Sequence, residues 1–263
     1  MKNQNTHIWL FLFLIAGVVP SCKIDKDNLP AVVDIPVAFR VQFMERFQPG
    51  PLPLELRLSS LEVMECTNYA VDYELDQGAR RIHLTIKDLI LPEPCDSGFG
   101  VASSTLNLGL LEDGEYELII NLKDVIQNEG LLVIRPESYT SQMETKDGLF
   151  ISPNPLFRVP DNSIWGGIFP KADSLYLLAE SFMADLQALA QPIHMAAGTY
   201  TPFTVNPDFT VTLTEPKAPG QGSTFVYRYT GDRSELINLV EYYRAAGDEG
   251  LPILLFDSEG YVF

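Results

Sequence analysis

Hydrophobic and polar residues alternate along much of the first half of the chain. The alternation is clear in five segments, residues 37–43, 54–58, 69–75, 82–86 and 116–122. Successive side chains of a strand point to opposite faces of a sheet, so each segment is a predicted strand with one buried face. Residues 99–110 and 131–135 have a weaker pattern of the same kind and are predicted strands as well.

Turn-forming residues separate these segments. Pro49–Pro53, Asp76–Gly78 and Asn128–Gly130 are rich in proline, glycine, aspartate and asparagine, and they predict turns. The hydrophobic phase changes after Leu58, which predicts a β-bulge near Ser59 and Ser60. Short strands with turns at this spacing predict an antiparallel β-sandwich over residues 32–137.

One motif within these strands resembles a known family. The segment Leu111–Leu118 has a tyrosine, Tyr116, at the start of a strong strand. It is similar to the tyrosine corner of immunoglobulin-like domains, in which the tyrosine hydroxyl bonds to upstream backbone. The resemblance implies an immunoglobulin-like sandwich. Those domains often carry a cysteine two residues after the tyrosine, where this chain has Leu118.

The second half of the chain combines strand and helix patterns. Residues 138–160 are rich in polar residues and proline, and they are predicted to be a linker with a short strand at 149–152. Apolar residues recur at helical spacing at 175–189 and 236–243, and Asp173 and Asp232 are expected to cap these two helices. Strand patterns around the helices predict an α+β layer domain at 161–263, with a ferredoxin-like topology plus an added hairpin as the first expectation.

The N-terminus has a different pattern. Ile8–Val19 is an uninterrupted apolar run of 12 residues, with Lys2 before it and Cys22 shortly after it. A membrane-spanning helix needs about 20 residues, so the run fits a signal peptide instead. Its arrangement resembles a bacterial lipoprotein signal, although Val19 stands where many such signals have leucine. An ordinary secretory signal, with Cys22 incidental, is the alternative.

The resemblance to a lipoprotein signal implies a cellular location for the protein. Residues 1–21 would be removed, and Cys22 would carry acyl chains, palmitate among them, at the start of a tether over 22–31. Lys23–Asn28 resembles the segment that sends some lipoproteins to the outer face of a Gram-negative outer membrane. We therefore expect a protein that is lipid-anchored in the outer membrane, on its periplasmic or cell-surface face.

Charge and cysteine content narrow the possible partners and bonds. The formal net charge is −17, and it becomes −18 when Lys2 is removed with the signal peptide. Such a chain repels nucleic acid, which we exclude as a partner. With Cys22 acylated, Cys66 and Cys95 remain as a pair in an oxidising compartment, so they are expected to form a disulfide. Two free buried thiols are the alternative.

The sequence contains no recognisable catalytic motif. We expect no catalytic residue of a known type, no metal site and no cofactor. The acidic run at 112–117 is interpreted as a solvated strand face and turn. Four aromatic residues are candidate ligand-binding residues that could offer flat faces to a sugar, with ordinary core packing as the alternative. They are Trp165, Tyr200, Phe203 and Tyr242.

These observations favour a non-enzymatic, lipid-anchored envelope protein that binds a glycan, a peptide or an envelope partner. The alternative is a hydrolase that acts on an envelope or external polymer with two carboxylates as acid and base; a purely structural role is the third. An exposed aromatic platform would favour a glycan, and a broad apolar patch would favour a protein partner. Two close carboxylates in a cleft, one with a raised pKa, would favour the hydrolase.

Overall fold

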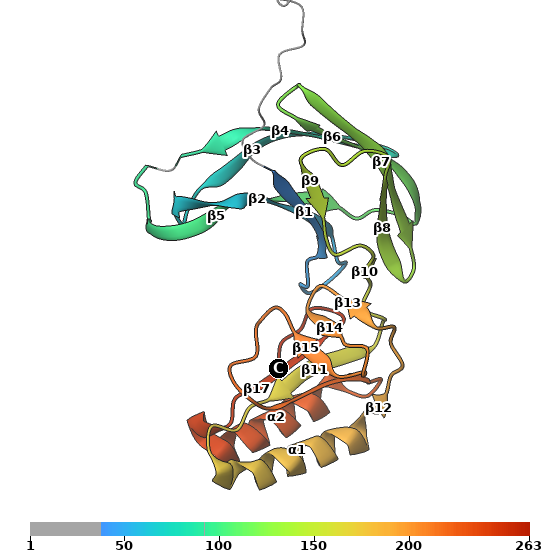
Figure 1. Ribbon diagram of the computed structural model, residues 1–263. Helices are drawn as coiled ribbons and strands as arrows, with labels where there is room; N and C mark the ends of the chain where they lie inside the picture. Colours follow the sequence, from blue (N-terminus) through green and yellow to red (C-terminus); the bar gives the residue numbers. More distant parts are fainter. Residues whose placement is uncertain (1–37, 92) are drawn as a thin grey trace, which may run out of the picture. The chain divides into compact units, whose positions relative to one another are not determined.

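The computed structural model describes residues 38–91 and 93–263, and all of them belong to one compact unit. Strands in several sheets and two α-helices make up this described part, which is a mixed β and α+β structure (Figure 1). The predicted signal peptide, the acylation site Cys22 and the tether lie outside the described residues. Within the described ranges, no helix combines the length and the apolar character needed to cross a bilayer.

The first sheet contains the strands that open the chain. Its members are β1 (Phe39–Glu45), β2 (Leu54–Cys66), β5 (Ser97–Gly109) and β9 (Leu149–Ile151). Their order is β5-β2-β1-β9, with β1 antiparallel to β2 and parallel to β9. Phe39, Val41 and Phe43 of β1 are buried. This confirms the strand that the alternation predicts, apart from Val37, which lies outside the described residues.

The second sheet has six strands. They are β3 (Ala70–Gly78), β4 (Arg81–Ile90), β6 (Gly114–Leu122), β7 (Ile126–Arg135), β8 (Ser138–Met143) and β10 (Leu156–Phe157). Their order is β10-β8-β7-β6-β4-β3. Neighbours run antiparallel, except that β4 pairs in parallel with β6.

The two sheets pack on each other around one core. Each contributes the apolar residues of one face, and many of them have almost no exposed surface. Examples are Val41, Leu56, Leu58, Ile82, Leu84, Leu118, Ile120 and Leu132. Full burial of one such side chain contributes about 1.5–3 kcal/mol. The predicted β-sandwich is therefore present, with mostly antiparallel pairing.

The predicted bulge in β2 is confirmed, but it does not bury the residues after it. The pairing of β2 with β5 shifts register between Ser59 and Val63. Leu54, Leu56 and Leu58 before the shift face the core. Leu61 and Val63 after it remain exposed.

Two of the segments predicted to be turns belong to strands in the structure. Asp76–Gly78 is the end of β3, and the chain turns at residues 79–80. Asn128–Gly130 lies within β7. The Asn128 side chain is buried, where it accepts a hydrogen bond from Asp147 N (2.7 Å) and donates one to Asp147 O (3.1 Å). The backbone of a distant loop thus satisfies the side-chain amide of Asn128, although the sequence around Asn128 is typical of a turn.

The predicted tyrosine-corner bond is present. The Tyr116 hydroxyl donates to the Glu112 backbone oxygen at 3.0 Å, and the ring is buried. The Arg80 guanidinium lies over the same ring at 4.8 Å from its centroid. Tyr116 therefore ties the start of β6 to the loop before it.

The disulfide between Cys66 and Cys95 is also confirmed. Cys66 is the last residue of β2, and Cys95 lies in the loop that leads to β5. The bond closes a loop of 29 residues in sequence separation. In the chain-entropy model such a cross-link stabilises the fold by roughly 3 kcal/mol.

Residues 138–160, predicted to be a linker, instead add strands to both sheets. β8 and β10 extend the second sheet, and β9 pairs with β1 of the first. The Asn154 side chain accepts from Ser141 N at 2.9 Å and donates to Ser141 O at 2.7 Å. These bonds hold a proline-rich segment whose composition alone suggests an independent linker.

A four-stranded antiparallel sheet with two helices follows. The strands are β11 (Ser163–Ile168), β12 (Gln191–Pro192), β16 (Ser223–Arg228) and β17 (Ile253–Asp257), in the order β12-β16-β11-β17. Helix α1 (Tyr176–Leu189) connects β11 to β12, and α2 (Arg233–Gly247) connects β16 to β17. Both helices lie on the same side of the sheet (Figure 1). We call this part the α+β layer.

The two helices begin differently. Asp232 caps α2 as predicted, because its carboxylate accepts a hydrogen bond from Ser234 N at 2.8 Å. Asp173 does not cap α1, since it begins a 3₁₀ turn (Asp173–Leu175) that precedes the helix. Helix α2 ends at Gly247.

A hairpin around Asn206–Asp208 lies within a separate small sheet. This sheet consists of β13 (Gly198–Thr199), β14 (Phe203–Val205) and β15 (Val211–Leu213). After β17, a single bridge joins Val262 to Phe256.

Candidate binding cleft

Strand β11 has two apolar faces. Ile164 and Ile168 point towards the helices and pack with residues such as Phe182 and Leu236. Trp165 points the other way, towards the small sheet. Gly166 lies so close to β17 that a Cβ atom there would collide with the Leu254 backbone, so only glycine fits at this position.

The structure brings together three of the four candidate aromatic residues. Trp165, Tyr200 and Phe203 are buried in one cluster. The Phe203 ring centroid lies 5.8 Å from that of Trp165 and 5.1 Å from that of Tyr200. Tyr242 is 67% exposed on α2 and is not part of this cluster. The three clustered rings are core residues, so their faces do not form an exposed platform.

A cleft of about 430 Å³ lies beside Trp165. Besides Trp165 of β11, residues from four other parts of the chain line it. The end of β1 and the loop after it contribute Met44, Glu45, Arg46 and Phe47, and β2 contributes Glu55 and Arg57. The segments around the small sheet contribute Thr201, Pro202, Glu215 and Pro216. The end of β17 and the residues after it contribute Phe256, Asp257, Gly260, Tyr261 and Val262. Phe47 meets Trp165 edge to face at 5.0 Å, and Phe256 stacks on it at 6.1 Å. The floor of the cleft is therefore aromatic.

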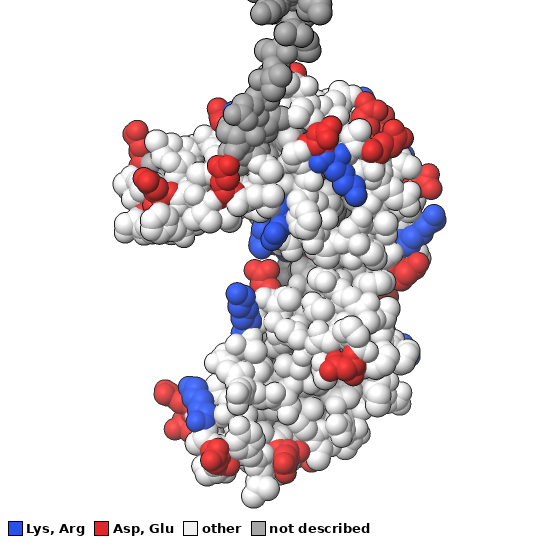
Figure 2. Space-filling view, viewed as in Figure 1, with Lys and Arg blue, Asp and Glu red and all other residues white. Residues whose placement is uncertain are grey.

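Four of the charged groups that line the cleft form two ion pairs with one another. Arg46 lies 3.3 Å from the Glu55 carboxylate, and Arg57 lies 3.9 Å from that of Glu215. The second pair joins β2 to the loop after β15. Figure 2 shows acidic and basic side chains next to one another where the β-sandwich meets the α+β layer. A ligand thus meets an apolar floor and a rim of neutralised charges.

Glu45 is the most deeply buried of the charged residues that line the cleft. Its side chain is 2% exposed, and its Oε1 accepts from the Tyr139 hydroxyl at 3.0 Å and lies 3.4 Å from Arg158 Nε. Its backbone N–H donates to Thr201 Oγ1 at 2.9 Å, which ties β1 to the segment before β14. Oε2 accepts no hydrogen bond, although the Val159 N–H lies towards the carboxyl group.

Burial is the dominant influence on the acidity of this group. It raises the pKa of the Glu45 carboxyl above 4.5, against the opposing effects of the Tyr139 hydrogen bond, the Arg158 charge and the Val159 N–H. Burial also raises the pKa of the Tyr139 hydroxyl. Glu45 therefore takes up a proton more readily in the folded chain than in the unfolded chain.

This shift predicts a pH effect on stability. A carboxyl group whose pKa is higher in the folded state contributes stability at low pH, and that contribution is lost as the pH rises through the folded-state pKa. The free energy of unfolding of Glu45→Gln should therefore increase relative to wild type as the pH rises above 4.5. Urea unfolding of both proteins at a series of pH values measures the difference. A difference that does not change with pH, or that falls, would contradict the prediction.

A second hollow, of about 520 Å³, lies on another side of Glu45. Asp113, Tyr139 and Arg158 line it too, and Arg158 Nη1 is 3.4 Å from the Asp113 carboxylate. One guanidinium thus bridges Glu45 and Asp113. Among the described residues, no group of three or more His, Cys, Asp or Glu side chains is arranged to hold a metal ion.

Neither Glu45 nor Arg158 is among the candidate residues that the sequence predicts. A signal for Glu45 was present, because it continues the inward-facing series Phe39, Val41 and Phe43 by two residues. An acid at the next inward position is expected to be buried and to need a partner. Nothing comparable marks Arg158, whose partner Glu45 lies 113 residues earlier.

Comparison of this chain with protein-family models, with curated protein sequences and with solved structures gives no match. Its function therefore has to be inferred from its own residues. The cleft, its paired charges and the buried Glu45 are the features of the described residues on which that inference rests.

Proposed function

We propose that this protein is a lipid-anchored envelope protein with a non-enzymatic role, and that it binds a segment of a partner protein in the cleft. The observation that carries the proposal is the aromatic floor of the cleft, formed by Phe47, Trp165 and Phe256. Concave sites with an apolar lining and a few polar groups are the usual places for ligand binding. The volume of about 430 Å³ fits one or two large side chains better than a whole folded surface.

The chemistry of the cleft favours an apolar side chain over a sugar or an ion. Arg46 and Arg57 are already paired with Glu55 and Glu215, so a charged ligand would have to break an ion pair to be recognised. The clustered aromatic rings considered for sugar stacking are buried. An apolar side chain gains from leaving water and leaves both ion pairs intact.

The proposed location of the protein is inferred from its N-terminal sequence. The apolar run and Cys22 resemble a lipoprotein signal, and an acylated Cys22 would hold the protein at the outer membrane, on its periplasmic or cell-surface face. The Cys66–Cys95 disulfide supports an extracytoplasmic location, because such bonds persist in oxidising compartments.

We also propose a fold type for each half of the structure. The sandwich is immunoglobulin-like, which the Tyr116–Glu112 hydrogen bond supports. It differs from the usual immunoglobulin pairing because β4 lies between β3 and β6 and runs parallel to β6. The α+β layer is ferredoxin-like with the small sheet inserted between β12 and β16, which the antiparallel order β12-β16-β11-β17 supports.

A hydrolase is the alternative function, and one observation favours it. Glu45 has a raised pKa and shares a hollow with Asp113, as an acid and a second carboxylate would. However, the Arg158 guanidinium contacts both carboxylates at 3.4 Å. It therefore occupies the space where a reacting bond or water would have to lie, and binding is the better-supported function.

Trp165 provides a direct test of binding in the cleft. The sequence has two tryptophans, Trp9 and Trp165, and removal of the predicted signal peptide leaves only Trp165. The mature protein would be titrated with acetylated, amidated peptides of glycine and serine that carry one central Phe, Leu, Ser, Lys or Glu. We expect the Phe and Leu peptides to shift the emission of Trp165 saturably, and the others not to.

Matched variants assign the signal to the cleft. Val262 lines the cleft and is exposed, so Val262→Arg should block it without unfolding the protein. Val125, exposed between β6 and β7, supplies the control variant Val125→Arg. Loss of the emission shift in the first variant alone supports the proposal. No saturable shift with any peptide, or equal binding by both variants, would refute it, and a shift with chitin oligosaccharides instead would identify a glycan site.

A further inference from the structure

An exposed apolar surface lies on β2 and β5, and none of its residues lines the cleft. It consists of Leu61 and Val63 of β2 and Phe99 and Val101 of β5, and we call it the β2–β5 apolar face. Phe99 is 79% exposed and Val63 is 63% exposed. Val63 and Val101 are directly paired across the two strands, so their side chains share one side of the sheet. Phe99 lies two residues before Val101 and points to the same side.

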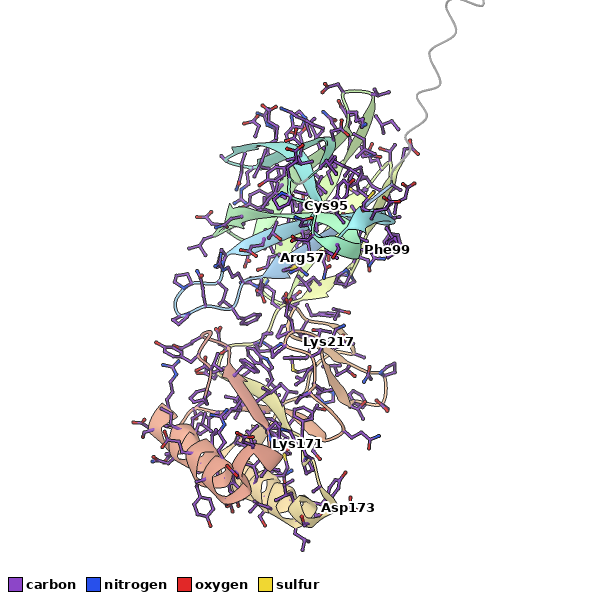
Figure 3. The ribbon with its side chains drawn as sticks, turned by 90° about the vertical axis from the view of Figure 1, so that its left-hand side faces the viewer. Arg57, Cys95, Phe99, Lys171, Asp173 and Lys217 are labelled. Atoms are coloured by element: carbon purple, nitrogen blue, oxygen red, sulfur yellow. A yellow bond between two sulfur atoms is a disulfide. The ribbon has the colours of Figure 1, made fainter. Side chains whose placement is uncertain are left out.

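The structure holds this face rigidly. Just beyond this face, the Cys66–Cys95 disulfide joins the end of β2 to the loop before β5. Asn68 clamps the same loop, because it donates to Pro94 O at 3.1 Å and accepts from Asp96 N at 3.0 Å. Figure 3 shows Phe99 at the margin of the sheets, on the same part of the fold as Cys95. Phe99 is therefore exposed on a strand whose start is held in place by a disulfide and by hydrogen bonds, and not on a loose loop.

The face lies beside the point where the N-terminal segment joins the fold. Leu61 N donates to the backbone oxygen of Ala38, the first described residue, at 2.8 Å. Cys22 precedes Ala38 by 16 residues. A chain of that length spans at most about 55 Å when fully extended. A bilayer that holds Cys22 is therefore within reach of the β2–β5 apolar face.

We propose that the β2–β5 apolar face contacts a lipid surface and inserts Phe99 and Val63 at the boundary between headgroups and acyl chains. This inference rests on the proposed acylation of Cys22. The anchor keeps the bilayer at a high effective concentration, so a weak apolar contact is enough. Glu62 and Glu65 are exposed beside the face, so a zwitterionic surface is favoured over an anionic one.

Brominated lipids test this contact. The acylated full-length protein would carry Phe99→Trp and be reconstituted in vesicles of phosphatidylcholine, with or without bromine on the acyl chains. Bromine quenches only tryptophan that approaches the acyl region. We expect Trp emission of this variant, after subtraction of the wild-type signal from Trp165, to be lost in brominated vesicles. The control Val125→Trp, at another exposed apolar position, should keep its emission.

The outcomes separate this inference from the proposed anchor. If the protein floats with the vesicles and the Phe99→Trp emission is not quenched, the lipid contact is refuted while the anchor stands. If the protein does not float with the vesicles, the anchor fails and this inference fails with it. Unquenched emission together with a dimer in sedimentation would refute the lipid contact and assign the face to a second copy of the chain.

Discussion

Trp165→Ala is expected to lower the free energy of unfolding by about 3–5 kcal/mol, the range for removal of a large buried aromatic side chain. Trp165 is 2% exposed and contacts three other rings. Phe47 belongs to the loop after β1, Phe203 to the small sheet and Phe256 to β17. Because the indole joins these three parts, the cavity left by alanine cannot close without moving one of them. Urea unfolding followed by circular dichroism measures the loss.

Tyr242→Ala is the matched control for this experiment. Tyr242 is an aromatic residue of the same half of the chain, but it is largely exposed on α2. Substitution of an exposed residue usually changes stability by no more than about 0.5 kcal/mol. Similar losses for the two variants would mean that Trp165 is not the centre of the packing described above.

Cys22→Ala should move the protein from the membrane fraction to the soluble fraction. Stable anchoring takes at least two acyl chains, and the proposed modification would attach all of them through this one residue. Fractionation, with mass analysis of the N-terminal peptide, measures both the release and the acyl groups.

The other two cysteines supply the control for this substitution. The double variant Cys66→Ala, Cys95→Ala lacks the disulfide but keeps Cys22. It should stay in the membrane fraction even though it is less stable. Unchanged membrane association of Cys22→Ala would remove the proposed anchor, and with it the proposed location.

Local patterns predicted much of the fold because the relevant physics is local. A strand with one buried face needs alternating side chains, and β1, β4 and β6 show this directly. The cap of α2 at Asp232 needs only residues within one helical turn. The turn predicted at Asn128 was wrong because its amide is satisfied by Asp147, which no local pattern reveals.

The candidate cleft could not be predicted in the same way. Its lining comes from segments as far apart as Met44 and Val262. The aromatic residues Trp165, Tyr200 and Phe203 were recognised as notable, but their burial depends on which elements cover them. Phe47, from the loop after β1, contributes to that cover and was not singled out in the sequence.

By itself, the sequence determined many of the strand segments and both helix segments, the acidic character, the cysteine pair and the resemblance to an acylation signal at Cys22. Each of these depends on residue types and on short spacings along the chain. Only the tertiary structure decided that Glu45 meets Tyr139 and Arg158, that residues 138–157 join the sheets, and that Leu61 and Val63 stay exposed. The reason is that burial and pairing between distant residues depend on how the whole chain packs, which no local pattern specifies.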